Sequence, residues 1–288
     1  MKLVIIGMGY IGVPTAVMFA KAGYDTVGIE RNKEKVAAIN KGECYIEEKL
    51  LPEMLKEVIA SKKLRASTDY SECKDADGII ICVETPLNKE LEPDYIALKS
   101  VINESAPNLK KGTIIMIEST LAPTTSERLI IPTIEKLSGL KAGKDFHFAV
   151  CSETIIPGNM MKEIVENSRV IGGIDEKSSE MAKKFYSSFV KGKIYLTNTT
   201  TAEFAKVVQN TYRDVNIALA NELALMCDQL GIDVNEAIKL VNIHPRVNVH
   251  SPGAGVGGHC IPKDPYLLAS QEGNCCPQQR MEGNEVAP

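Results

Sequence analysis

Short apolar runs alternate with amphipathic segments over the first two thirds of the chain. Uninterrupted apolar runs suit strands that are buried on both faces of a parallel sheet. We expect strands at residues 3–6, 26–29, 64–67, 78–83, 113–118, 146–150, 169–171 and 193–196. Apolar positions at helical spacing predict helices between these strands. The first of these helices ends near residue 22, and the others cover residues 33–40, 50–61, 95–106, 125–137 and 176–189. This alternation predicts an α/β fold, a doubly wound Rossmann-type parallel sheet over residues 1–197.

The longest helical pattern follows the sheet, at residues 199–230. Thr200 followed by Glu203 indicates a capping box at its start. At 1.5 Å per residue this helix would be roughly 45 Å long, more than a small domain needs, so we expect a homodimer packed through it. A shorter helix at 235–242 and the loop after it complete a small all-α central domain, residues 198–268.

The periodicity ends at the last part of the chain. Residues 269–288 have few apolar positions, which predicts a disordered tail that fits no family segment. No apolar run approaches the roughly 18 residues of a membrane helix, and the run at residues 3–6 is too short for a signal peptide. We therefore expect a soluble, cytoplasmic protein without a membrane partner.

Charge and cysteine usage exclude two classes of function. The net charge is -4, and its charged residues are interspersed without a basic stripe, so a nucleic-acid partner is not expected. The eight cysteines form no CxxC pair and have no metal-like spacing with the four histidines. We interpret them as reduced thiols and expect no bound metal.

The sequence GMGYIG, residues 7–12, lies between the first strand and the first helix. In this context Gly7 permits a tight turn, Gly9 lets a pyrophosphate approach the backbone, and Gly12 allows close packing of the helix. Tyr10 and Ile11 complete the turn, and the helix N-terminus supplies free N–H groups for phosphates. The turn predicts a dinucleotide site.

An acidic residue ends the second strand. Glu30 would accept hydrogen bonds from both ribose hydroxyls and repel a 2′-phosphate, which favours NAD over NADP. Arg31 and Lys35 follow closely and are further cofactor candidates.

Three polar residues follow later strands at the carboxyl edge of the sheet, where open α/β sheets bind ligands. Thr85 and Thr120 are candidates for the cofactor side, or they serve ordinary turn and cap chemistry. Glu153 is the only carboxylate that we expect at this edge. It either positions a water or substrate hydroxyl or is simply solvated.

A glycine- and proline-rich loop, PGAGVGGHCIPKDPYLL at residues 252–268, carries the candidate nucleophile Cys260. His259, Lys263 and Asp264 lie beside it, and a neighbouring cation stabilises a thiolate. The alternative is a small buried core thiol.

Lys206 and Asn210 share one face of the long helix and can point toward the sheet edge. The alternative is that both lie on an exposed polar face.

Taken together, these motifs resemble the UDP-glucose/GDP-mannose dehydrogenase family over residues 1–268. The resemblance rests on GMGYIG, the ETP and EST strand ends, the Lys206 and Asn210 helix, and GGHCIPKDP. CSETIIPGN, NIHPRV and PGAGVGGHCIPKDP are most similar to the branch that oxidises UDP-N-acetylmannosamine. The resemblance implies oxidation of the C6 alcohol of a UDP-sugar to a carboxylate, with two NAD and no metal.

The resemblance also implies roles for individual residues. Cys260 would carry thiohemiacetal and thioester intermediates, while Lys206 and Asn210 would stabilise the oxyanion. By the same resemblance, Asp264, Thr120 and Glu153 would hold the hydrolytic water. Arg246 and His250 would contact the substrate, and Lys263 would contact the cofactor.

Family members carry a further C-terminal domain that binds the nucleotide of the sugar, and this sequence has no counterpart of it. A frameshift or truncation is one interpretation, and the alternative function is then a truncated NAD-binding, dimerising remnant without turnover. An unrelated NAD-dependent dehydrogenase of the 3-hydroxyacid type is disfavoured because such enzymes lack the GGHC loop.

Overall fold

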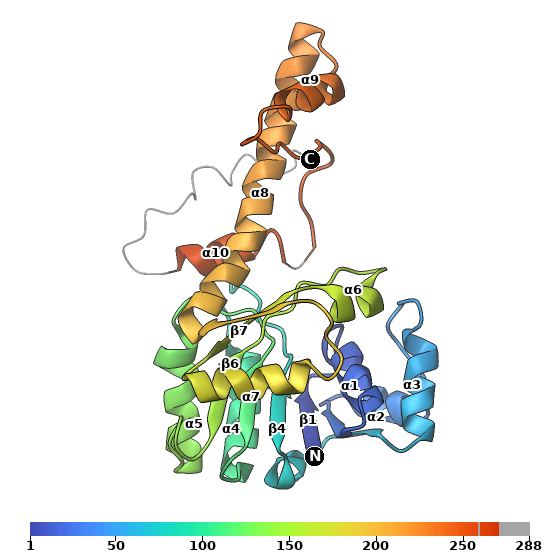
Figure 1. The fold of residues 1–288 in the computed structure, drawn as a ribbon, viewed down its shortest axis with the longest axis vertical. Helices are drawn as coiled ribbons and strands as arrows, with labels where there is room; N and C mark the ends of the chain where they lie inside the picture. Colours follow the sequence, from blue (N-terminus) through green and yellow to red (C-terminus); the bar gives the residue numbers. More distant parts are fainter. Residues whose placement is uncertain (259, 271–288) are drawn as a thin grey trace. The chain divides into compact units, whose positions relative to one another are not determined.

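The expected strands form one sheet in the computed structural model, which describes residues 1–258 and 260–270. The strands are β1 (Lys2–Ile6), β2 (Asp25–Ile29), β3 (Leu64–Ser67), β4 (Gly78–Ile81), β5 (Ile114–Ile117), β6 (His147–Val150), β7 (Arg169–Gly173) and β8 (Ile194–Asn198). Their spatial order is β3-β2-β1-β4-β5-β6-β7-β8 (Figure 1). Neighbours pair in parallel except β6 and β7, which are antiparallel. The predicted doubly wound α/β fold is confirmed, with this one departure from a fully parallel sheet.

Ten α-helices lie within the described residues. They are α1 (Gly12–Lys21), α2 (Lys33–Asn40), α3 (Leu51–Ala60), α4 (Ile96–Ser105), α5 (Ile131–Ser138), α6 (Met160–Glu166), α7 (Glu176–Tyr186), α8 (Thr199–Leu230), α9 (Val234–Val241) and α10 (Asp264–Ala269). A π-helical turn at Ser126–Ile130 leads into α5, and 3-10 turns lie at Tyr70–Asp75 and Ala106–Asn108. The sequence did not predict α6 or α10, because helices of 7 and 6 residues are too short to show a period.

Alternating side chains of the sheet enter two hydrophobic cores. In β1, Leu3 and Ile5 pack in the core covered by α1, α3 and α7. Val4 and Ile6 pack in the core on the other face, which α4 and α5 cover (Figure 1). All four side chains are buried. Burial on both faces explains why these strands are continuous apolar runs in the sequence.

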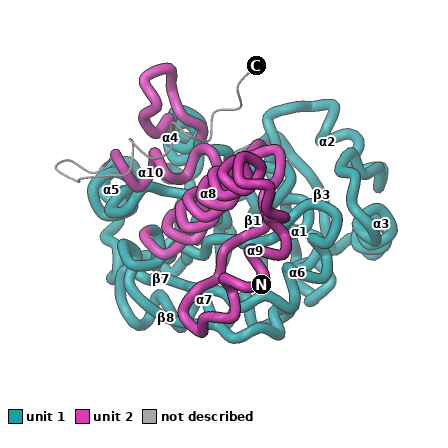
Figure 2. Tube along the Cα trace, turned by 90° about the horizontal axis from the view of Figure 1, so that it is seen from above, with its two compact units in different colours: residues 1–85, 95–203 teal, residues 86–94, 204–288 magenta. Residues whose placement is uncertain are grey.

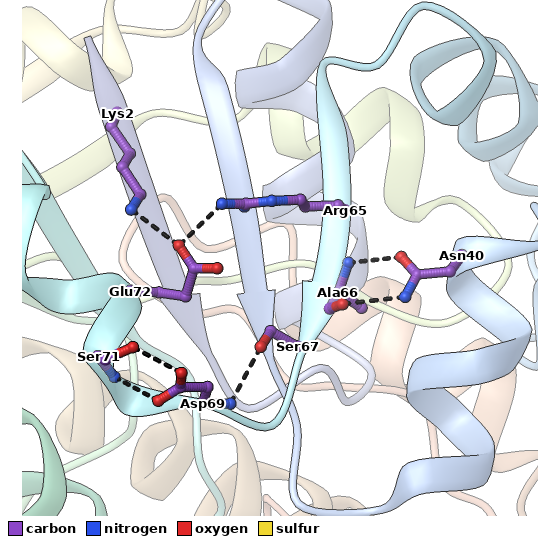
Figure 3. Close-up of polar contacts among 8 residues, drawn as sticks. All are labelled: Lys2, Asn40, Arg65, Ala66, Ser67, Asp69, Ser71 and Glu72. Atoms are coloured by element: carbon purple, nitrogen blue, oxygen red, sulfur yellow. Dashed lines mark hydrogen bonds and ion pairs between the residues drawn. The ribbon is translucent and has the colours of Figure 1, made fainter.

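The outer edge of β3 is closed by a side chain (Figure 3). Asn40, the last residue of α2, donates from Nδ2 to the Ala66 carbonyl at 2.9 Å and accepts from the Ala66 N–H at 2.7 Å. Its amide thus takes the place of a further strand and pairs with the Ala66 N–H and C=O groups on the open side of β3. Lys2 of β1 and Arg65 of β3 each lie 2.8 Å from the carboxylate of Glu72, in the 3-10 turn after β3.

The chain divides into two compact units (Figure 2). The first unit contains residues 1–85 and 95–203, and the second contains 86–94 and 204–288. The division lies within α8, between Glu203 and Phe204, whereas the sequence predicted a domain boundary before that helix. The predicted disorder falls on residues 271–288, which are outside the described residues, although α10 already includes Ala269.

The start of α8 differs from the predicted capping box. The Thr201 N–H donates to Asn198 Oδ1 at 2.8 Å, so Asn198 caps the helix. The Glu203 carboxylate instead accepts from the Ser126 N–H at 2.9 Å. The capping-box prediction is therefore wrong, because a distant helix start competes for the glutamate. Among the described helices, none is long and apolar enough to cross a bilayer.

Candidate functional site

The turn between β1 and α1 has the geometry that a phosphate-binding loop needs. Gly7 has φ +94°, a left-handed conformation that favours glycine. A Cβ on Gly12 would lie 1.9 Å from the Gly7 carbonyl oxygen, so a side chain there cannot fit without a shift. A Cβ on Gly9 would have no heavy atom within 4 Å, which leaves open space over that backbone. The geometry of the three glycines is compatible with a dinucleotide pyrophosphate, and their contact with it stays a prediction.

Glu30 follows β2 and lies against this turn. Its carboxylate accepts from the Met8 N–H at 3.3 Å and from the Asn32 N–H at 3.0 Å. Lys35 Nζ lies 5.2 Å from the ring centroid of Tyr45, and Arg31 is exposed. An acidic side chain beside the glycine turn is the arrangement that binds a ribose diol.

The remaining turn residues differ in exposure. Tyr10 is 44% exposed, and Ile11 occupies the N-cap position of α1 without a side-chain capping bond.

The ends of β4 and β5 are tied together at the carboxyl edge. The Thr85 hydroxyl donates to the Thr120 carbonyl at 2.7 Å. Thr85 is buried and Thr120 is half-buried. This bond supports an ordered edge, and the roles predicted for the two threonines stay predictions.

Glu153 is paired with a buried arginine, Arg169, that no local sequence pattern indicates as part of the site. The Arg169 guanidinium, 3% exposed, forms an ion pair with Glu153 and lies 3.7 Å from Glu118. Burial disfavours the cation, yet the two facing carboxylates raise the pKa of Arg169 above its ordinary value. Glu153 is therefore not simply solvated.

Glu118, directly after β5, is the centre of this buried network. It accepts hydrogen bonds at 3.0 Å from the Thr15 hydroxyl, at 3.0 Å from the Cys82 thiol and at 2.7 Å from the Tyr186 hydroxyl. The expectation that Glu153 is the only carboxylate at this edge is wrong. A charged residue that ends the buried run TIIMIE was the available signal.

A second cluster lies within the second unit. Asp264, fully buried at the start of α10, accepts from Asn210 Nδ2 at 2.6 Å, and Lys263 Nζ lies 3.6 Å from its other oxygen. Burial raises the pKa of Asp264, and the charges of Lys263 and Lys206 with the Asn210 hydrogen bond oppose that shift. The structure thus brings together four of the residues that the sequence proposed.

Cys260 lies one turn before this cluster in the chain. Its carbonyl accepts from the Lys263 N–H at 3.1 Å and from the Asp264 N–H at 2.9 Å, so the cysteine leads directly into α10. The cysteine is exposed and is a free thiol, which excludes the interpretation as a buried core residue. Gly258, with φ +84°, supplies the preceding left-handed turn. The prediction for His259 falls outside the described residues.

Arg246 and His250 follow α9. Arg246 is exposed, and its backbone N–H donates to His244 Nδ1 at 3.3 Å. The His250 ring packs edge-on against Tyr212 of α8, with centroids 6.0 Å apart. Their predicted contacts with substrate stay predictions.

The predicted catalytic residues belong to both units. Thr120 and Glu153 lie in the first unit, and Cys260, Lys206, Asn210 and Asp264 lie in the second. Within the described residues, no group of three or more His, Cys, Asp or Glu side chains could hold a metal ion.

Family models match almost the whole chain. Residues 1–190 match the NAD binding domain of the UDP-glucose/GDP-mannose dehydrogenase family. Residues 200–281 match the central domain of that family, so this match includes part of the predicted non-family tail.

Individual relatives agree with the family models. The chain is 49% identical over 270 residues to a UDP-N-acetyl-D-mannosamine dehydrogenase from Pyrococcus horikoshii, which covers 94% of this chain and 64% of the relative. The solved structure of a UDP-D-ManNAc dehydrogenase from the same organism superposes with a TM-score of 0.95 at 47% identity, covering 99% of this chain and 68% of that one.

A UDP-N-acetyl-mannosamine dehydrogenase from Staphylococcus aureus superposes with a TM-score of 0.87 at 40% identity, covering 99% of this chain and 67% of that one. All of these relatives are longer than this chain, which spans 64% of the length of the Pyrococcus horikoshii enzyme.

Proposed function

Because this chain belongs to the UDP-glucose/GDP-mannose dehydrogenase family, we propose that it oxidises the C6 alcohol of a UDP-sugar to a carboxylate. UDP-N-acetylmannosamine is the proposed sugar nucleotide, since the relatives described above carry that substrate in their names. The observation that carries the proposal is the cluster of Asp264, Asn210 and Lys206 with an exposed Cys260 one turn away.

NAD is the cofactor of the first unit, and the residues of the glycine turn fit it. Gly9 leaves room for the pyrophosphate, and Glu30 offers a carboxylate to the ribose hydroxyls. When bound, NAD would supply the hydride acceptor for the two oxidations at C6, one molecule for each.

Cys260 supplies the nucleophile for the second half of the reaction. Its sulfur adds to the C6 aldehyde to form a thiohemiacetal, and after the second oxidation the resulting thioester is hydrolysed by water, which frees the acid and the thiol. Lys206 and Asn210 donate hydrogen bonds to the oxygen at C6 and stabilise its negative charge.

Asp264 assists proton transfer in this scheme. Burial raises the pKa of its carboxyl toward the working pH, which makes it a better general base than an exposed aspartate. Thr120 and Glu153 are proposed to hold the hydrolytic water. Lys263, Arg246 and His250 are proposed to bind cofactor or substrate.

We propose a homodimer through α8. Tyr212, Leu219, Met226 and Leu230 recur at helical spacing on this helix, and all four are exposed in the single chain. A stripe of this kind is typical of a helix that packs against a partner helix.

The first test is an absorbance assay for NADH with the purified chain. UDP-N-acetylmannosamine should give two NADH per sugar, and UDP-N-acetylglucosamine and UDP-glucose should give slower rates. Cys260→Ala should lower the rate about 1,000-fold or more, because it removes the nucleophile. Cys227→Ala, which removes a half-buried thiol from α8, is the matched control and should leave the rate within about twofold.

Undiminished four-electron oxidation by Cys260→Ala would contradict the mechanism. NAD binding without NADH formation from any of the three sugars would instead support the alternative, an NAD-binding, dimerising chain without turnover.

A further inference from the structure

The segment between α2 and α3 is attached to the glycine turn by a tyrosine. The Tyr45 hydroxyl donates a hydrogen bond to the carbonyl oxygen of Met8, the residue between Gly7 and Gly9. Ile46 next to it is buried in the core, and the Glu48 carboxylate accepts from the Gly158 N–H at 2.7 Å. The segment is therefore fixed at several points, and Tyr45 is its contact with the turn.

This hydrogen bond determines the orientation of one peptide group. The described part of the chain has no cis peptide, and in a trans peptide the carbonyl and the following N–H point in opposite directions. Because Tyr45 binds the Met8 carbonyl, the Gly9 N–H points away from Tyr45. The preceding peptide is fixed in the same way, because the Met8 N–H donates to Glu30 at 3.3 Å.

The groups around Tyr45 keep its hydroxyl protonated and its ring in place. Burial and the nearby charge of Glu30 raise the pKa of its hydroxyl, so the phenol stays protonated and remains a donor well above neutral pH. The Lys35 ammonium lies 5.2 Å from the ring centroid, a cation–π distance that restrains the ring.

We propose that Tyr45 is a positioning residue of the NAD site. Its hydroxyl holds the Met8–Gly9 peptide so that the Gly9 N–H faces the cofactor pyrophosphate, in the open space over Gly9. The inference rests only on the NAD-binding part of the proposed function, so it is tested without any turnover.

The test is calorimetric titration of Tyr45→Phe, which removes only the hydroxyl and keeps the ring over which Lys35 lies. Affinity for NAD and for ADP-ribose should fall about 3- to 10-fold, the range for one lost hydrogen bond. Affinity for adenosine, which lacks the phosphates, should not change. Tyr24→Phe is the matched control, because Tyr24 packs between Phe19 and Phe185 rather than against the turn, and it should bind all three ligands as the unchanged chain does.

The thermal midpoint without ligand separates positioning from mere stabilisation. A Tyr45→Phe chain that melts earlier but binds NAD and ADP-ribose with unchanged affinity would overturn the proposal. An equal loss for adenosine would also overturn it, because the effect would then not concern the phosphates. Tyr45→Leu, which also removes the ring, should weaken NAD binding at least as much as Tyr45→Phe.

Discussion

At the scale of single residues, two glutamates that the sequence analysis selected as candidates contact partners that the sequence does not indicate. Glu203 was expected to cap its own helix, yet it is buried against Ser126. Glu153 was considered as a solvated carboxylate, yet it pairs with Arg169. In both cases the partner is distant in the chain, so no local pattern could have indicated it.

Glu203 predicts a pH dependence of stability. Burial raises the pKa of its carboxyl to about 7 from the ordinary 4.5. Because the folded-state pKa lies above the unfolded one, the stabilisation is complete below about pH 4.5 and is lost as the pH rises through about 7. At about 1.4 kcal/mol per unit, the free energy of unfolding should decrease by up to about 3 kcal/mol over this range.

Glu203→Gln should remove that component. Urea unfolding at pH 5 and pH 8 should show a smaller loss of stability for Glu203→Gln than for the unchanged chain. Glu34→Gln, an exposed glutamate in the first turn of α2, is the control and should retain the full difference. An identical pH dependence in Glu203→Gln would show that Glu203 titrates normally.

At the scale of elements, local patterns predicted the strands and most of the helices within a few residues. Strands such as β4 and β5 are entirely buried, so their sequences are apolar without interruption. The π-helical turn before α5 was not predicted, because its residues SERLI have the same apolar spacing as a normal helix. The backbone of such a turn depends on contacts beyond the segment.

The turn between β1 and α1 allows a matched pair of substitutions. Gly12→Ala should destabilise the fold by about 1–3 kcal/mol, because its Cβ would lie 1.9 Å from the Gly7 oxygen. Gly9→Ala should change stability by less than about 0.5 kcal/mol, because no heavy atom lies within 4 Å of the new Cβ. It should nevertheless weaken NAD binding at least tenfold, about 1.4 kcal/mol, by occupying that space.

Urea unfolding and NAD titration of both variants provide the measurements. Strong destabilisation by Gly9→Ala, or NAD affinity unaffected by it, would contradict the assignment of the open space to the cofactor.

At the scale of the whole molecule, the proposed dimer has a direct test. The unchanged chain should have twice the 31.4 kDa mass of one chain in light scattering after gel filtration. Leu219→Glu combined with Met226→Glu introduces charges into the exposed stripe of α8 and should give the mass of one chain. Asp228→Lys, on the opposite side of the helix, should keep the mass of the dimer.

A monomer at all concentrations for the unchanged chain would reject the dimer. A dimer that persists in the double variant would place the interface elsewhere.

Local sequence patterns were sufficient to predict the sheet, the glycine turn and the residues that identify the family. These features are local, because burial on two faces requires apolar runs and a phosphate turn requires glycines at fixed spacing. Lys206 and Asn210 were also predictable as a pair, since residues four apart share a helix face.

The folded structure was needed to establish which polar groups meet. It placed Asp264 against Asn210, formed the buried Glu118 and Arg169 network, and attached Tyr45 to the Met8 carbonyl. Each of these contacts joins residues far apart in the chain. Their energies depend on burial and distance, which exist only once the chain has folded.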